Sequence, residues 1–198
     1  MKPSRIIPIV SVLAVVAWWF WPEPAITHPP GVLVPEEPDQ RPVPERKQWS
    51  KNGYQILALA RFHIRALVLH RERYRMGKES DLSPVDFALG WGAMSNQQII
   101  DQIDISQSFR WYHWQSSHLP ITNGDVITHS SNMHMIPADD DVEETLLSVI
   151  KGDVVELDGY LVEVHGQKGW KWVSSLRRDD TGDGACELVW VEKAVVHE

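Results

Sequence analysis

Residues 6–21 form the longest apolar run of the chain, and Ser11 is its only polar side chain. In helical geometry this run extends roughly 24 Å, somewhat less than the hydrocarbon core of a bilayer at about 30 Å. Lys2 and Arg5 precede the run, and tryptophans gather at its end, as they do at membrane–water interfaces. We therefore expect residues 1–21 to be a single-pass membrane anchor with a cytoplasmic N-terminus.

A cleaved signal peptide is the alternative for the same run. Cleavage requires small residues in an A-x-A-like pattern after the apolar region. Residues 21–24 instead read Trp-Pro-Glu-Pro, and Ala25 and Thr27 match the pattern poorly. An uncleaved anchor is the preferred interpretation. It places the remaining chain in the periplasm, on the outer side of a bacterial inner membrane.

Prolines dominate residues 22–47, with eight of them between Pro22 and Pro44. Proline lacks a backbone N–H and fixes φ, so such a stretch favours extended polyproline II over a helix or a central strand. We expect a linker here, followed by one folded domain over residues 48–198.

The first part of that domain has helical patterning. Apolar residues within residues 48–75 recur at three- and four-residue steps, which predicts a long helix. Residues 83–86 read Ser-Pro-Val-Asp, a capping serine followed by proline, which predicts the start of a second helix. Glycines on both sides of Trp91 indicate a close backbone approach, and residues 96–103 are expected as a short helix.

The pattern changes to strands from about residue 104. Residues 109–114 are aromatic and strand-like, and residues 122–125 carry a tight-turn signal. Residues 126–129 are then expected as the returning strand. Residues 130–138 are predicted to be a loop.

The last part of the chain predicts one helix and three strands. The helix is expected over residues 139–150, where acidic residues crowd the first turn as the helix dipole favours. Residues 153–164, 170–176 and 185–193 read as strands joined by glycine-containing turns, which predicts a meander with a bulge at Gly159. The expected fold class is therefore α+β, with helices followed by a small antiparallel β-barrel or curled sheet.

Two resemblances add to this reading. Residues 152–162, with the sequence GDVVELDGYLV, resemble the opening strands of OB-type barrels, which implies a small barrel. Residues 106–112, 131–138 and 182–187 are similar to segments of bacterial membrane-anchored envelope proteins with no assigned activity. That second resemblance implies an envelope location.

Charge narrows the choice of partner. The chain has 19 Lys and Arg against 27 Asp and Glu. With Lys2 and Arg5 set aside, 17 basic residues remain against the same 27 acidic ones, so the exported part is near −10. Such a balance argues against nucleic acid and anionic lipid surfaces as partners.

Histidine and cysteine provide the candidate chemistry. His113, His129 and His134 lie close in the sequence, and imidazole is the commonest metal ligand. Three such ligands with an open fourth position would suit a catalytic zinc ion, although no H-E-x-x-H spacing is present. Cys186 is the only cysteine and lies in an apolar stretch, so we expect a buried, inert thiol.

Aromatic residues provide the other candidate surface. Tryptophan and tyrosine anchor many interfaces, and the candidates are Trp111, Tyr112, Trp114, Trp170 and Trp172. The leading hypothesis is a non-enzymatic accessory protein that has no cofactor and binds an envelope protein or a cell-wall component. The alternative is a metal-dependent envelope hydrolase that uses the three histidines and zinc.

Overall fold

The computed structural model describes residues 25–197, so the expected membrane anchor lies outside the described residues. Between residues 25 and 197, none of the helices has both the length and the apolar character that crossing a membrane requires. This part of the chain is mostly sheet, with a few short helices. The elements are β1 Asp39–Pro42, β2 Gln48–Lys51, β3 Tyr54–Arg73, η2 Glu79–Asp81, β4 Val85–Gly90, η3 Gly92–Ser95, α2 Gln97–Ile100, β5 Asp104–Ser108, β6 Trp111–Gln115, α3 Asn123–Thr128, β7 Ser130–Pro137, α4 Asp140–Ser148, β8 Val154–His165, η4 Gln167–Gly169, β9 Lys171–Val173 and β10 Glu187–His197.

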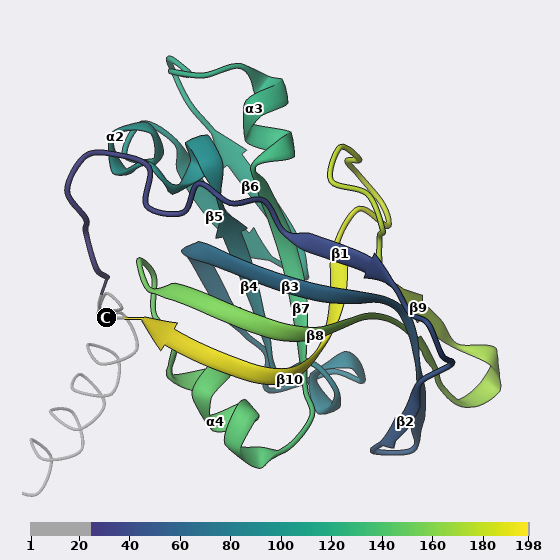
Figure 1. Cartoon of the computed structure of the whole chain (residues 1–198). Helices are drawn as coiled ribbons and strands as arrows, with labels where there is room; N and C mark the ends of the chain where they lie inside the picture. The colour runs from purple at the N-terminus through teal and green to yellow at the C-terminus, as the bar shows by residue number, and fades with distance from the viewer. Residues whose placement is uncertain (1–24, 198) are drawn as a thin grey trace, which may run out of the picture.

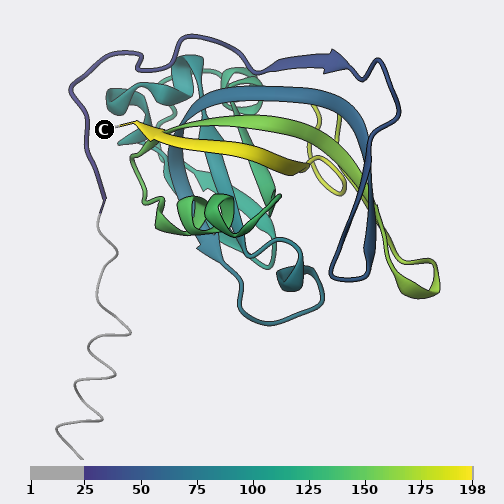
Figure 2. The ribbon, with the colours of Figure 1, turned by 60° about the horizontal axis from the view of Figure 1, so that its bottom comes forward.

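The main sheet curls until its pairings close into a ring (Figure 1, Figure 2). The order around the ring is β3-β4-β7-β10-β8, and β8 pairs again with β3. All these pairs are antiparallel except β7–β10, which is parallel. β1 and β2 add to β3, β9 adds to β8, and β5 and β6 form a separate hairpin. The expected α+β class and curled sheet are confirmed, whereas the expected order of helices before strands is wrong.

The predicted helix over residues 48–75 is wrong, because this segment forms β2 and the long strand β3. Phe62 and Ile64 are buried, whereas Arg61 and Arg65 are exposed, which is the two-residue period of a strand. Leucine, alanine and arginine favour helices, so local propensity points the other way. Pairing along both edges of β3, with β8 on one side and β1, β2 and β4 on the other, overrides that propensity.

The predicted helix after Ser83 is also wrong, because Val85–Gly90 is strand β4. Every residue of β4 is buried, so the strand shows no polar–apolar alternation in the sequence. The short helix predicted over residues 96–103 is confirmed in shorter form as α2, with Asn96 as its cap.

In residues 122–137 the structure has a helix followed by a strand, where a strand followed by a loop was predicted. The expected returning strand over residues 126–129 is wrong, because Thr122 and Asp125 form a capping box that starts helix α3. The expected loop over residues 130–138 is also wrong, because Ser130–Pro137 is the central strand β7. Ser130, Asn132 and His134 contact Tyr112, Gln107 and Trp172, so these polar residues are buried without an apolar pattern in the sequence.

The C-terminal elements exist as predicted, but their pairing differs. Helix α4 packs against β7 and β10. The expected meander is wrong, because β10 pairs with β8 and β7 and β9 pairs with β8. The register shifts on β10 between Val191 and Lys193, so the bulge lies opposite Gly159. A Cβ on Gly159 would lie 1.9 Å from the Trp190 carbonyl oxygen, so glycine permits this close approach.

From Ala25 onward, the proline-rich stretch lies along the domain (Figure 1). Ile26 N donates to Lys151 O at 2.9 Å, and Gly92 N donates to Val34 O at 2.7 Å. Val34 is fully buried, and residues 39–42 pair with β3 as β1. Residues 25–47 therefore contribute to the folded unit.

Candidate functional site

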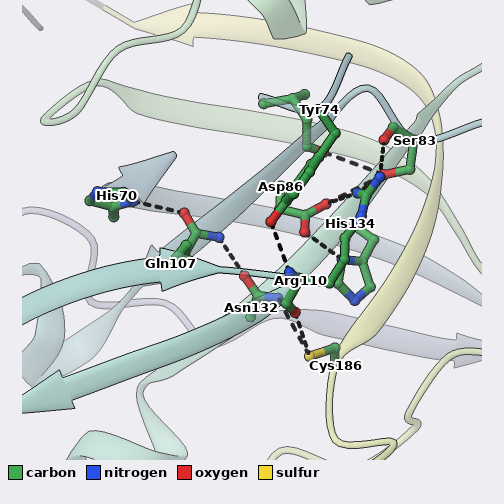
Figure 3. A network of polar contacts seen from close by, with 10 residues as sticks. His70, Tyr74, Ser83, Asp86, Gln107, Arg110, Asn132, His134 and Cys186 are labelled. Atoms are coloured by element: carbon green, nitrogen blue, oxygen red, sulfur yellow. Dashed lines mark hydrogen bonds and ion pairs between the residues drawn. The ribbon is translucent and has the colours of Figure 1, made fainter. Parts of the chain in front are cut away.

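A pair of buried charged residues lies on the outer face of β4 and β7. Asp86 is directly opposite His134 in the antiparallel register. Their neighbours Phe87 and Met133 belong to the core, so Asp86 and His134 point to the other face. Asp86 is 0% exposed and His134 is 3% exposed. The Asp86 Oδ2 to His134 Nδ1 distance is 2.9 Å (Figure 3).

Arg110 covers this pair from the tip of the β5–β6 hairpin. The φ angle is 51° at Phe109 and 70° at Arg110, the only two residues between the paired Ser108 and Trp111. Positive φ at both central positions defines a type I′ turn, which normally takes asparagine or glycine. Side chains as large as phenylalanine and arginine are strained there and persist only where surrounding contacts hold them.

The contacts of Arg110 supply that constraint. Its Nη1 donates to Asp86 Oδ1 at 2.5 Å, and its Nη2 donates to Ser83 O at 2.8 Å. Its backbone N–H donates to the Tyr74 hydroxyl at 3.0 Å, and the guanidinium lies 3.7 Å from the centre of the Tyr74 ring. Asp86 is therefore held between Arg110 and His134 (Figure 3).

Cys186 joins the same cluster through Asn132. Asn132 precedes His134 by two residues on β7, so both side chains lie on one face. Its Nδ2 donates to Cys186 Sγ at 3.4 Å and to Arg110 O at 3.0 Å. Its Oδ1 accepts from Gln107 Nε2 at 2.5 Å, which fixes the orientation of the amide. The Cys186 sulfur thus faces a hydrogen-bond donor (Figure 3).

Electrostatics favour a protonated His134. Burial alone lowers the pKa of His134, but Asp86 and the nearby Cys186 outweigh it and raise that pKa to about 9. Asp86 lies beside Nδ1, so Nε2 is the ring nitrogen without a contact to Asp86. The Trp172 ring lies 4.8 Å from the imidazole centre and covers it.

A buried ion pair holds the loop that carries Cys186. Arg178 pairs with Glu187, which is 1% exposed, and its Nη2 also donates to Gln40 Oε1 at 2.5 Å. The Arg178 guanidinium lies 5.5 Å from the centre of the core Phe62 ring. Ser175 N donates to Cys186 O at 3.0 Å and closes the base of the loop.

Two hollows meet at Cys186, whose side chain is half-buried. One, here called the aromatic groove, is lined by Trp111, Tyr112, Trp114, Ser130, Asn132 and Asp180, among others. The other, here called the basic groove, is lined by Arg110, Trp111, His134, Lys171 and Trp172, with glycines of the loop. Cys186 borders both grooves, so its side chain is less buried than we expected.

No known protein family, curated protein or solved structure significantly matches this chain. The interpretation of the site therefore rests on its geometry.

The structure does not gather the three histidines proposed as zinc ligands. His113 is exposed on β6, and His134 is buried beside Asp86. His129 follows α3, where its Nδ1 donates to Asp125 O at 2.8 Å and its ring packs on Gly92. A Cβ on Gly92 would lie 2.3 Å from the His129 ring, which explains the glycine beside Trp91.

Across residues 25–197, one group of side chains is placed to hold a metal ion, namely His63, Glu156 and Asp158. His63 Nδ1 lies 3.0 Å from Asp158 Oδ1, and His197 Nε2 lies 2.9 Å from Glu156 Oε2. These cross-strand pairs account for the four side chains without an ion.

Four of the five aromatic candidates line the two grooves, whereas Trp170 packs against a smaller, separate hydrophobic cluster that includes Ile56 and Val164. Trp111, Tyr112 and Trp114 line the aromatic groove, with Trp111 42% exposed. Trp172 lines the basic groove, whereas Trp170 packs against Tyr54 with ring centres 5.6 Å apart. Burial and the hydrogen bond to Ser130 leave the pKa of Tyr112 at about 12, so its hydroxyl is neutral.

Sequence reasoning missed Asp86, Arg110, Asn132 and Cys186 as members of one site. They come from β4, the β5–β6 turn, β7 and the loop before β10. Only the strand register brings them together. The sequence prediction placed Asp86 at the start of a helix, His134 in a loop and Cys186 on a strand, so nothing in it brought the three residues together.

Proposed function

We propose that the chain is a membrane-anchored accessory protein of the bacterial envelope, and that it binds a peptide segment of another periplasmic protein in the aromatic groove. The observation that carries this proposal is the convergence of Trp111, Tyr112 and Trp114 on one hollow beside buried polar groups. Ligand sites commonly combine aromatic walls with a few fixed polar groups. Exposed tryptophan is also a frequent anchor of protein interfaces.

The position of the groove on the barrel supports the same proposal. The ring order β3-β4-β7-β10-β8, with a parallel pair between the third and fifth strands, resembles the OB fold. OB barrels bind ligands on the face of their second and third strands, between the loops that follow strands one and four. Here those strands are β4 and β7, which carry Asp86, Asn132 and His134. The loop after the fourth strand, β8, carries Cys186.

Charge favours a peptide over the nucleic acids that OB barrels often bind. The part of the chain after the anchor is near −10, and Asp180 lines the aromatic groove. Phosphate backbones are repelled by such a surface. A peptide segment with apolar and basic side chains fits both the tryptophans and the acid. The zinc-hydrolase alternative would need His113, His129 and His134 around one ion, and their separate positions lend it no support.

Photo-cross-linking in whole cells tests this proposal. A photoreactive residue at position 111 of the full chain should give a protein adduct. The same residue at position 76 should give none, because Met76 is 89% exposed but lines neither groove. An adduct that a cell-wall hydrolase removes would identify a glycan partner instead. Equal labelling from both positions, or none from 111, would overturn the groove as the binding site.

A further inference from the structure

We infer that the partner of the aromatic groove binds as an added β-strand, through the backbone of Tyr112 and Trp114 on the free edge of β6. The inference rests on the proposed function, because it takes the aromatic groove as the place where the partner lies. It adds the form of the partner, which is an extended stretch of polypeptide held mainly by its main chain.

Strand β6 has an edge on which a further strand can be added. It pairs with β5 in a two-stranded sheet, and no other strand within residues 25–197 pairs with it. An edge strand presents a row of N–H and C=O groups that have no ladder partner. Recognition domains use such edges to bind extended peptides by main-chain hydrogen bonds.

The turn of the hairpin determines which groups point to that edge. A two-residue loop joins Ser108 to Trp111, so these two residues form the first hydrogen-bonded pair. Hydrogen-bonded and non-hydrogen-bonded pairs alternate along an antiparallel ladder. Tyr112 and Trp114 therefore belong to non-hydrogen-bonded pairs, and their backbone groups point away from β5. Among residues 25–197, no backbone group outside the hairpin bonds to the N–H or C=O of either residue.

The aromatic groove lies along this edge. Trp111 and Tyr112 are consecutive strand residues, so their side chains lie on opposite faces of the hairpin. Both line the aromatic groove, whereas none of the residues of β5 does. A hollow that both faces reach lies beside the edge of the sheet. The opposite wall comes from the loop of residues 180–186, so an extended chain would lie between β6 and that loop.

The composition of β6 leaves the edge open to pairing. Natural edge strands are commonly protected by charged side chains or by proline. Residues 111–115 read WYHWQ, without proline, lysine, arginine, aspartate or glutamate. The strand therefore lacks the residues that usually prevent another strand from pairing.

The same geometry indicates the sequence of the partner. Alternate residues of a strand are about 6.7 Å apart, so Tyr112 and Trp114 would bond alternate residues of the partner. Partner side chains would then lie in turn beside Trp111 and beside Tyr112, and apolar side chains fit both positions. Asp180 lines the groove and favours a basic residue. A second copy of this chain would bring the same charge of near −10, so a separate polypeptide is the favoured occupant.

Hydrogen exchange of the full chain in detergent tests the edge before any partner is bound. The amides of Trp111 and His113 point to β5 and should be protected. We expect the amides of Tyr112 and Trp114 to exchange at least about tenfold faster than these two. Slow exchange at Tyr112 and Trp114 in the free chain would mean that the edge is already covered, and would overturn the inference.

The adduct formed by a photoreactive residue at position 111 tests the added strand itself. In this adduct we expect exchange at Tyr112 and Trp114 to slow by at least about tenfold, because both amides would donate to the partner. An adduct without this protection would overturn the added strand and leave the groove as the binding site. Absence of any adduct would overturn the proposed function and this inference together. An adduct with the mass of two chains would identify a second copy and overturn the separate partner.

A matched pair of substitutions separates the backbone of Trp114 from its indole ring. Trp114→Ala removes the side chain and keeps the N–H, whereas Trp114→Pro removes both. Proline is tolerated on edge strands where the N–H faces outward. With the photoreactive residue at position 111, we expect an adduct yield at least about fivefold lower for Trp114→Pro than for Trp114→Ala. Equal yields would overturn the inference, and unchanged exchange at His113 shows that the hairpin remains paired in both variants.

Discussion

Asp86 and His134 face each other across β4 and β7, and each is enclosed by protein, with Oδ2 and Nδ1 2.9 Å apart. Replacing Asp86 by alanine leaves Arg110 and His134 buried without their carboxylate. Such a loss typically costs about 3–5 kcal/mol. We expect urea denaturation to show a fall of this size for Asp86→Ala. Asp158→Ala, which breaks a half-exposed pair with His63, should cost less than about 1 kcal/mol. Equal losses for the two variants would contradict the structure.

The pKa of His134 makes stability depend on pH. In the folded protein this pKa is about 9, against an ordinary value of 6.5. A raised pKa means that the folded state holds its proton more tightly than the unfolded chain. The resulting stability is complete below about pH 6.5 and is lost as pH rises through about 9. We expect the free energy of unfolding to fall by roughly 1–3 kcal/mol across this window. The slope should be absent in His134→Gln and retained in His113→Gln.

The pair between Arg178 and Glu187 should control the order of the loop that carries Cys186. Burial lowers the pKa of Arg178 to about 10, which still leaves it charged at neutral pH. Glu187→Gln removes its buried counter-charge and should cost about 3 kcal/mol. We expect faster amide hydrogen exchange and faster protease cleavage within residues 175–186. Arg177→Gln, which breaks an exposed pair with Asp179, should leave both rates unchanged.

The strained turn at Phe109 predicts a substitution that stabilises the fold. Phe109 has φ of 51° and is 90% exposed, so its side chain contributes little packing. Phe109→Gly should raise stability by about 0.5–1 kcal/mol because glycine adopts positive φ freely. Phe109→Val should lower it, since branching at Cβ conflicts with that conformation. The thermal unfolding midpoints of the unmodified protein, Phe109→Gly and Phe109→Val test this prediction. A midpoint that is highest for Phe109→Val and lowest for Phe109→Gly would show that the turn is not strained.

Local signals in the sequence identified some elements and failed for others. Helix α4 was predictable because Asp139 and the acids after it mark a helix start on their own. The strand β8 was predictable from its valines and its alternation. β3 was not, because its leucines, alanines and arginines favour a helix. β4 was not, because every one of its residues is buried and its sequence shows no alternation.

The site shows the same division between local and long-range information. Trp111, Tyr112 and Trp114 were recognisable as surface candidates because they lie together in the sequence. The pairing of Asp86 with His134 depends on the register of β4 and β7, which are separated by the whole β5–β6 hairpin and α3. A shift by one residue would turn His134 toward the core and leave Cys186 alone.

The contact between Ala25 and Lys151 ties the start of the described chain to the turn before β8. If residues 6–21 lie in a bilayer, Ala25 follows Trp21 by four residues, which reach at most about 14 Å even when extended. The barrel would then stand directly on the lipid surface, with the turn before β8 as its foot. Figure 1 shows the loop before β10, which leads to Cys186, on the side of the molecule away from Ala25. That loop would be held at a nearly fixed height above the membrane. A partner that binds beside this loop would then have to arrive from the aqueous side.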